Sequence, residues 1–325
     1  MRYLQSGTGR QISRIGLGTW QFGSREWGYG DDYVAVTTRL VERALDLGIT
    51  LFDTAEAYGF GRSERLLGAA LRTAAEDDPT RPQPFVATKL FPMMPVAPVV
   101  EQRAVASAAR LGVQTIDLYQ VHQPNPVVRD GATMRGMRAL HQVGLVGAVG
   151  VSNYSLERWR DAEDAYGSPV LSNQVQYSIA HRGPEEDLLP YAAEKDRIVI
   201  AYSPLAQGFV SGRYRADNPP GGAIRRANPL FLPESLDRAN ELFGVLREVG
   251  DAHGVGPSQA ALAYVLHHPR VVAIPGASSV EQVESNAAAA DIELAEDEFA
   301  ALRGAAIRFE PVHGWRAVAG MVRRR

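Results

Sequence analysis

Short apolar runs alternate along the chain with longer stretches in which apolar residues recur every three or four positions. The runs are nearly continuous and rich in β-branched residues, which is typical of parallel strands covered on both faces. We predict eight such strands, at residues 14–19, 49–54, 84–89, 115–122, 146–152, 170–176, 198–203 and 271–276.

The stretches between these runs have the periodicity of amphipathic helices. Gly48 and Gly112 end two of the stretches and are predicted C-caps, and Ser63 opens another as a predicted N-cap. We predict helices at residues 32–48, 63–76, 99–112, 131–144, 155–167, 184–196, 233–254, 256–269 and 279–290.

Eight strand–helix units in succession predict an α/β fold of the (β/α)8 TIM-barrel type. An open doubly wound sheet is the alternative, but no G-x-G-x-x-G opens a strand-to-helix turn. We therefore predict one barrel domain over residues 1–325. A long loop rich in Gly, Pro and Arg follows the seventh strand at 205–232, and a C-terminal tail occupies 308–325. Loops of this length are usually functional or mobile.

The composition narrows the classes of function. Of the 325 residues 45% are hydrophobic, and 34 Lys and Arg against 37 Asp and Glu give a net charge of −3. This balance does not favour a nucleic-acid or membrane partner. No signal peptide and no run of apolar residues long enough to cross a membrane is expected. Cysteine is absent, so disulfides and thiolate metal sites are excluded, no metal is predicted, and a cytoplasmic location is expected.

Ionisable side chains stand at the carboxyl ends of three successive predicted strands. Asp53 ends the second strand, Lys89 the third and His122 the fourth, and Tyr58 lies in the loop after Asp53. Alone, each residue is readily explained as a turn, rim or structural residue. Because the reactive groups of such barrels sit at the carboxyl ends of the strands, the four together indicate a site.

These side-chain types suit proton transfer to a carbonyl oxygen. A phenol has a pKa near 10 and is a weak acid at neutral pH. We expect the Lys89 ammonium to lower the pKa of Tyr58 and Asp53 to hold Lys89 in place. His122 is expected to hydrogen-bond the same substrate oxygen. Such a phenol donates its proton as a hydride reaches the carbonyl carbon.

Eight ordered motifs between about residue 3 and about residue 295 resemble the aldo-keto reductase superfamily. They are "GLGTW", "LFDTAEAYGFGRSE", "ATKL", "DLYQVHQP", "GVSNY", "NQVQYS", "AYSPLAQG" and "IPGASSVEQVESN". The chain is most similar to the bacterial general-stress and inositol-cluster reductases and to the potassium-channel β-subunit group. The resemblance implies a barrel that binds NADPH without a Rossmann fold and acts on a small-molecule carbonyl. It also implies a catalytic tetrad of Asp53, Tyr58, Lys89 and His122, with Tyr58 as the general acid.

The resemblance also assigns cofactor contacts. Ser152 and Asn153 at the end of the fifth strand and Gln174 in the sixth would bind the nicotinamide carboxamide. Tyr202 would stack on the nicotinamide ring. The segment "SPLAQG" would wrap the pyrophosphate with its backbone N–H groups. The implied cofactor residues are Thr19, Trp20, Asp53, Ser152, Asn153, Gln174, Tyr202, Ser203, Pro204, Leu205, Ala206, Gln207, Gly208, Arg213, Arg225, Gly276, Ser278, Gln282, Ser285 and Asn286.

NADP is favoured over NAD because Arg213, Arg225 and Arg226 are available to a 2′-phosphate. The helix that begins near Ser279 is expected to direct its N-terminus at a phosphate. Some relatives carry a basic residue where this chain has Ser279. A solvated-loop role for Arg225 or Arg226 is equally open.

Three regions depart from the family pattern or extend it. "HQPNP" at 122–126 replaces the more usual His-Trp-Pro-Asp-Pro, so an aromatic wall of the substrate site is lost. Trp27 and Tyr29 are expected on the substrate side or in a lid. Trp315 is expected either to reach back over the mouth or to lie in a frayed, solvated tail.

The leading hypothesis is an NADPH-dependent carbonyl reductase that also runs in reverse as an alcohol dehydrogenase. The alternative of a different class is a cofactor-sensing regulatory subunit with slow or vestigial turnover. A third hypothesis, a Schiff-base aldolase with Lys89 as nucleophile, is less favoured because Asp53 should keep Lys89 protonated.

Overall fold

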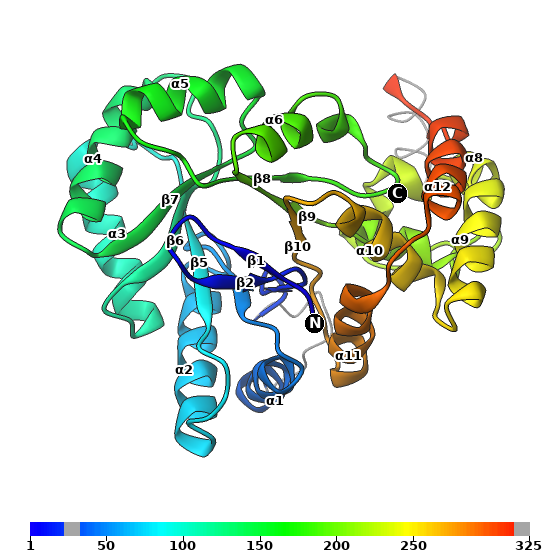
Figure 1. Cartoon of the computed structure of the whole chain (residues 1–325), viewed down its shortest axis with the longest axis horizontal. Helices are drawn as coiled ribbons and strands as arrows, with labels where there is room; N and C mark the ends of the chain where they lie inside the picture. Colours follow the sequence, from blue (N-terminus) through cyan, green and yellow to red (C-terminus); the bar gives the residue numbers. More distant parts are fainter. Residues whose placement is uncertain (23–32, 315–325) are drawn as a thin grey trace.

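The computed structural model describes residues 1–22 and 33–314. Eight parallel strands in this part of the chain form a curled sheet in which each strand neighbours the next in sequence, and helices surround it (Figure 1). The predicted (β/α)8 fold is confirmed. The strands are β3 (Leu17–Gly18), β4 (Leu51–Asp53), β5 (Phe85–Leu90), β6 (Ile116–Val121), β7 (Val146–Ser152), β8 (Ser172–Gln176), β9 (Ile198–Tyr202) and β10 (Val271–Ala273).

The first and last strands of the sheet meet and close the barrel. Isolated parallel bridges join Ile15 to Ala273 and Gly18 to Gly276. Arg14 reinforces this closure. Its guanidinium donates to the carbonyl oxygens of Leu266 and His268, at the end of the helix before β10, and of Val271 in β10. Burial lowers the pKa of Arg14 to about 10, so the guanidinium stays charged at neutral pH.

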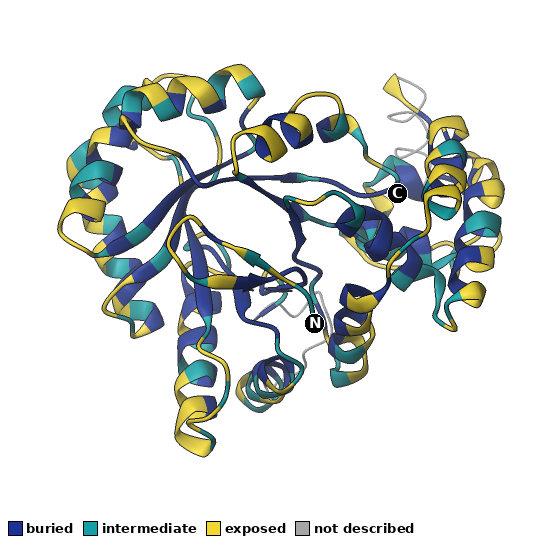
Figure 2. Cartoon of the chain, in the orientation of Figure 1, coloured by how far each residue is buried: buried dark blue, intermediate teal, exposed yellow. Residues whose placement is uncertain are grey.

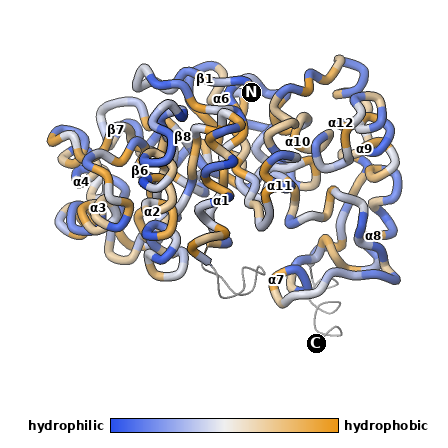
Figure 3. Tube along the Cα trace, turned by 90° about the horizontal axis from the view of Figure 1, so that it is seen from below, coloured by the Kyte–Doolittle hydropathy of each residue, from blue (hydrophilic) through white to orange (hydrophobic). Residues whose placement is uncertain are grey.

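A short hairpin lies across the amino-terminal end of the barrel. Its strands β1 (Tyr3–Gln5) and β2 (Gln11–Ser13) pair antiparallel, and Ile12 is buried among the side chains inside the barrel. Figure 3 shows the hairpin and helix α7 on opposite sides of the molecule. The sequence did not predict the hairpin because three-residue strands with alternating polarity carry little signal.

Helices cover the outer face of the sheet, and their outward-facing residues are exposed whereas the strands are buried (Figure 2). No helix in the described part of the chain is both long and apolar enough to span a bilayer. The α-helices are α1 (Tyr33–Asp46), α2 (Arg62–Asp77), α3 (Ala97–Leu111), α4 (Asp130–Gln142), α5 (Leu156–Tyr166), α6 (Leu188–Glu194), α7 (Ala223–Arg226), α8 (Pro233–Arg238), α9 (Asn240–Ala252), α10 (Pro257–His267), α11 (Val280–Ala288) and α12 (Glu296–Arg308).

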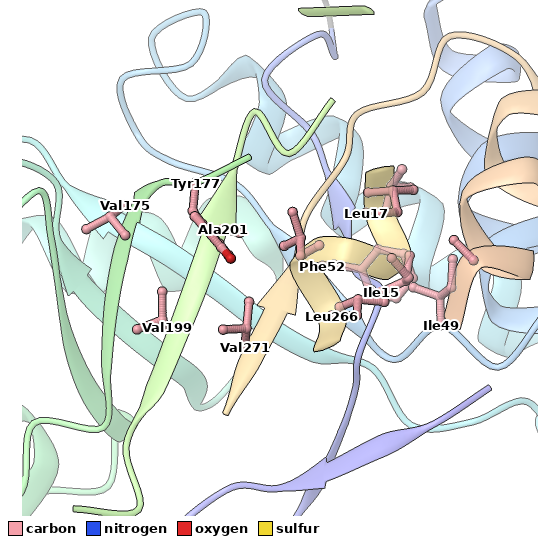
Figure 4. Close-up of a cluster of buried hydrophobic side chains, with 14 of the residues drawn as sticks. Ile15, Leu17, Ile49, Phe52, Val175, Tyr177, Val199, Ala201, Leu266 and Val271 are labelled. Atoms are coloured by element: carbon pink, nitrogen blue, oxygen red, sulfur yellow. The ribbon is translucent and has the colours of Figure 1, made fainter. Parts of the chain in front are cut away.

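The strands carry two separate apolar layers because successive side chains point to opposite faces of a sheet. One layer lies between the sheet and the helices, and Figure 4 shows Ile15, Phe52, Val199, Leu266 and Val271 in it. The other fills the inside of the barrel toward its amino-terminal end. Its members are Ile12, Leu51, Phe85, Ala87, Leu118, Ala148, Leu171, Ile198, Ile200, Val272 and Ile274.

Several local expectations differ from the structure. Ser63 is not an N-cap: α2 begins at Arg62 after Gly61, and the buried Ser63 hydroxyl contacts Thr19 and Thr54 instead. The helix expected at 184–196 is split into a short 3-10 turn and α6, and that at 233–254 into α8 and α9. Helix α12 was not predicted. The expectations for Trp27, Tyr29 and Trp315 concern positions outside the described residues.

Candidate active site

Polar side chains take over from the apolar ones at the carboxyl end of the barrel interior. The alternation that points Leu51 inward also points Asp53 inward, and Lys89 follows Phe85 and Ala87 on the inward face of β5. The inward positions at the carboxyl ends of β6 to β9 are also polar. They are Gln120, Ser152, Gln174, Gln176 and Tyr202.

Lys89 connects the acid and the phenol that the sequence singled out. Its ammonium donates to Asp53 Oδ1 at 2.5 Å, to the Thr54 carbonyl oxygen at 2.8 Å and to the Tyr58 hydroxyl at 3.2 Å. Three acceptors match the three protons of an ammonium. Lys89 is fully buried and Asp53 is 2% exposed, so water does not compete for this pair.

His122 lies beside Tyr58 at the mouth of the barrel. The two ring centroids are 5.7 Å apart with the rings nearly perpendicular. Both side chains line the same cavity. Burial, and secondarily the Lys89 ammonium, lower the pKa of His122 to about 3. The imidazole is therefore neutral at neutral pH and acts through hydrogen bonds rather than as a cation.

Burial is the largest influence on the other three groups. It raises the pKa of Tyr58 above its ordinary value, and the lowering by Lys89 does not offset this rise. The expectation of a lowered pKa for Tyr58 is thus wrong for the cofactor-free chain, and the phenol keeps its proton. Burial lowers the pKa of Lys89, but the charges and hydrogen bonds of Asp53 and Tyr58 outweigh burial, so the pKa of Lys89 is raised. A charged Lys89 disfavours the Schiff-base hypothesis.

We predict that His122 does not titrate between about pH 5 and pH 8, where an ordinary histidine does. Its pKa near 3 means that the proton is taken up only in strong acid. Proton NMR of the histidine rings measures this directly, with the His122→Asn variant identifying the signal. A His122 resonance with a midpoint near 6.5 would contradict the prediction.

A cavity of about 710 Å³ opens at this end of the barrel and takes in most of the predicted site. Asp53, Tyr58 and His122 line it, whereas Lys89 lies behind them. Of the predicted cofactor residues only the buried Ala206 is not in its wall. The others line it: Thr19, Trp20, Asp53, Ser152, Asn153, Gln174, Tyr202, Ser203, Pro204, Leu205, Gln207, Gly208, Arg213, Arg225, Gly276, Ser278, Gln282, Ser285 and Asn286.

Hydrogen bonds fix the polar groups at the ends of β7 to β9. The Tyr202 hydroxyl donates to Asn153 Oδ1 at 3.0 Å, and Asn153 Nδ2 donates to the His122 carbonyl at 3.3 Å. The Ser152 hydroxyl donates to the Gln174 carbonyl at 2.8 Å. Asn153 has a φ of 60°, a backbone conformation that is uncommon for residues other than glycine. Strain of this kind clusters at functional sites.

The segment after β9 has an unusual backbone. Ala206, Gln207 and Gly208 are consecutive and all have positive φ. Two groups from the loop that follows hold this turn: Arg225 Nε donates to the Gln207 carbonyl at 3.0 Å, and Asn228 Nδ2 donates to Gln207 Oε1 at 3.1 Å. The long loop therefore folds back onto the cavity wall through α7. Arg226, the other arginine of this helix, is not in the wall.

The far end of the cavity is formed by α11 and the residues before it. Ser279 caps this helix by accepting a hydrogen bond from the Gln282 backbone N–H. Gln282 Oε1 in turn accepts from the Ser278 N–H at 2.8 Å. The predicted helix start at Ser279 is confirmed. Glu281 and Gln282 of the first turn line the cavity, as does Ser278 just before the cap.

Comparison with known proteins identifies the fold and the class. The aldo/keto reductase family model matches residues 14–307, nearly the whole chain. The chain belongs to the aldo/keto reductase family. The resemblance noted in the sequence and the predicted class of oxidoreductase are both confirmed.

Three relatives illustrate how close this aldo/keto reductase is to known members. An uncharacterized oxidoreductase of Mycobacterium tuberculosis is 55% identical over 99% of this chain and 98% of its own. The structure of glycerol dehydrogenase from Gluconobacter oxydans has a TM-score of 0.85 at 29% identity and covers 96% of this chain and 97% of that one. An aldo/keto reductase of Klebsiella pneumoniae, in complex with NADP and acetate, has a TM-score of 0.74 at 27% identity, with 96% of both chains covered.

The cavity of this aldo/keto reductase also includes residues that the sequence did not single out. Gln176 stands two positions after Gln174 on the inward face of β8, so strand alternation alone would have found it. Glu281 lies in the first turn of α11. Gln123 stands where the family pattern has a tryptophan, and Gly18, Ile274 and Pro275 lie inside the motifs quoted for the family. The full set is Gly18, Gln21, Gln123, Gln176, Ser211, Ser258, Ile274, Pro275 and Glu281.

Proposed function

We propose that this aldo/keto reductase reduces an aldehyde or ketone to the alcohol with NADPH as the reductant. The observation that carries the proposal is the hydrogen-bonded line from Asp53 through Lys89 to Tyr58, which ends in the cavity wall beside His122. It places one proton-bearing phenol next to one fixed ammonium.

Bound NADPH supplies the hydride that reduces the carbonyl carbon. Tyr58 donates its proton to the carbonyl oxygen, which becomes the hydroxyl of the product. The Lys89 ammonium, 3.2 Å from the phenol oxygen, stabilises the phenolate that forms. His122 lies where its neutral ring can hydrogen-bond the same oxygen and polarise the carbonyl. In reverse, the Tyr58 phenolate would take the hydroxyl proton of an alcohol, and bound NADP⁺ would accept the hydride.

The donor groups of the cavity fit a dinucleotide of this kind. Its volume of about 710 Å³ lies within the range of small-molecule sites. Asn153, Gln174 and Tyr202 offer amides and an aromatic face for a nicotinamide at the Tyr58 end. The Ala206 and Gly208 N–H groups already bond to the Ser203 and Leu205 carbonyls. The charge for a pyrophosphate therefore comes from the Arg213 and Arg225 guanidiniums in the cavity wall. The NADP complex of the Klebsiella relative supports the same choice of cofactor.

A panel of aldehydes and ketones, followed by NADPH absorbance with NADH in parallel, tests this function. Reduction of at least one carbonyl well above background, and no burst of turnover without a carbonyl, is the expected result. Tight NADPH binding with no carbonyl reduced above background would sink the proposal and favour the regulatory-subunit alternative. The panel also narrows the substrate, for which sugars, ketones, aldehydes and secondary metabolites are all candidates.

We predict that Arg225→Ala weakens NADPH binding by about tenfold, because a charge-assisted hydrogen bond to the 2′-phosphate is lost. The Kd for NADH should change much less, since NADH carries no such phosphate. Titration calorimetry with both nucleotides measures the two values. Arg226→Ala is the matched control, because Arg226 is adjacent but outside the cavity wall. An equal loss for both nucleotides would refute 2′-phosphate recognition by Arg225.

A further inference from the structure

One row of residues crosses four neighbouring strands inside the barrel. The strand register pairs Lys89 of β5 with Gln120 of β6, Gln120 with Gly150 of β7, and Gly150 with Ser172 of β8. Residues paired in this way point to the same face of a sheet. Gln120 is therefore the neighbour of Lys89 in this row, and Ser172 lies two strands beyond Gln120, although neither belongs to the predicted site.

Gly150 has no side chain, and this leaves the space in which Gln120 and Ser172 contact each other. A Cβ at position 150 would lie 2.4 Å from Ser172 Oγ and 2.9 Å from Gln120 Cγ, too close for either atom. With glycine there, the Ser172 hydroxyl donates to Gln120 Oε1 at 3.2 Å across the intervening strand. Gln120 and Ser172 are both fully buried.

These contacts fit one orientation of the Gln120 amide. Because a carboxylate only accepts, the Nε2 donor faces Asp53 Oδ2, 3.5 Å away, and the Ser172 hydroxyl donates to Oε1 on the other side and holds that orientation. Gln174 Nε2 donates to the same oxygen at 2.7 Å, while Lys89 occupies the other. A flipped Gln120 amide would instead set its oxygen against the carboxylate. A buried carboxylate depends on such donors, since no water replaces them.

We propose that Gln120 is a positioning residue for Asp53, that Ser172 orients it through the gap at Gly150, and that Gln120 keeps Asp53 Oδ2 hydrogen-bonded when Gln174 engages the cofactor. The inference rests on the proposed function for the role of the cofactor, but the contacts belong to the chain itself. Asp53 in turn keeps Lys89 in place for Tyr58. Gln120 thus acts on the reaction through Asp53, Lys89 and Tyr58, and Ser172 acts through Gln120.

The test compares two variants with the wild type, Gln120→Met and Ser172→Ala. Gln120→Met keeps the size of the side chain but removes its polar atoms. Carbon-13 NMR of aspartate carboxyls in the cofactor-free protein, with Asp53→Asn for assignment, follows the Asp53 titration. We expect its pKa to rise by about half a unit in both variants, because a donor to the ionised form is lost or misdirected. Lys89, Tyr58 and His122 are the other ionisable groups near Asp53 and are unchanged in both variants.

In the holoenzyme, kcat for a test aldehyde should fall about fivefold in Gln120→Met, with the acid limb of its pH profile moved to higher pH. The Kd for NADPH should stay within about twofold. Ser178→Ala is the control, since Ser178 is also a fully buried serine but its hydroxyl has no hydrogen-bond partner among the described residues.

Each outcome either supports or overturns the positioning role of Gln120. If Gln120→Met lowers only thermal stability and leaves both the Asp53 titration and the pH profile unchanged, the residue is structural and the proposal is overturned. Should Gln120→Met fail to fold, the same criteria apply to Ser172→Ala, which removes one oxygen atom only. If the wild type reduces no carbonyl but Asp53 still titrates at higher pH in the variants, the proposed function fails while the positioning role stands.

Discussion

Replacing Tyr58 by phenylalanine is expected to lower kcat by about a thousandfold, within the range assigned to a positioned general acid. The substitution removes one hydroxyl, which is the only atom of the side chain that contacts Lys89 by a hydrogen bond. The ring that packs beside His122 stays. Binding of NADPH should therefore remain within about twofold, since no nucleotide contact is assigned to this hydroxyl.

Stopped-flow measurement of NADPH oxidation with a saturating aldehyde, together with fluorescence titration of NADPH, separates these two effects. Tyr119→Phe is the matched control because Tyr119 is also buried and its hydroxyl has no hydrogen-bond partner among the residues described. Its kcat should be close to that of the wild type. If Tyr58→Phe lost nucleotide affinity and turnover in equal measure, the hydroxyl would be a binding group and its role as general acid would be wrong.

The second large effect is expected from Lys89→Met, which should abolish turnover and lower the free energy of unfolding by about 3–5 kcal/mol. The substitution leaves the Asp53 carboxylate buried at 2% exposure without its cation. An unpaired buried charge is among the most costly defects in a protein interior. Urea unfolding at pH 7 measures the loss of stability, and the carbonyl assay measures turnover.

The double variant Asp53→Asn/Lys89→Met distinguishes charge from packing. With both charges removed, most of the lost stability should return, because the amide that replaces the carboxylate carries no charge, whereas turnover should stay absent. Arg308→Met is a useful comparison, since it breaks an exposed ion pair with Glu241 and should leave the free energy of unfolding nearly unchanged. A Lys89→Met protein as stable as the wild type would show that Asp53 is not held as a carboxylate.

Most of the barrel could be predicted because its signal is local. A parallel strand buried on both faces is an unbroken apolar run, and each run here is followed by a stretch of helical periodicity. The hairpin at 3–13 was not predicted because its strands are too short to show a pattern. The predicted cap at Ser63 was wrong because the Ser63 hydroxyl forms a tertiary hydrogen bond with Thr19. Helix α12 also had a signal in the sequence, the three acidic residues of its first turn, although it was not predicted.

The candidate site could also be predicted only in part. Asp53, Lys89 and His122 were visible because charge at the end of an apolar strand is conspicuous, and the rule for barrels says where such residues gather. The pKa of Tyr58 could not be obtained from residue types, since burial, which only coordinates reveal, outweighs the nearby ammonium. Gln120 had a signal of its own, a polar amide in the middle of "DLYQVH", but its partner Ser172 lies 52 positions away.

The closure between β3 and β10 has a consequence for how the protein is made. Gly16 and Gly18 bond to the carbonyls of Ala273 and Pro275, and Arg14 reaches across to Val271. These contacts span more than 250 residues of sequence, so a nascent chain cannot complete the cylinder until the residues through Pro275 have left the ribosome. Until then the half-built sheet has two unpaired edges, which can pair with another chain, and the contacts of this seam remove both edges.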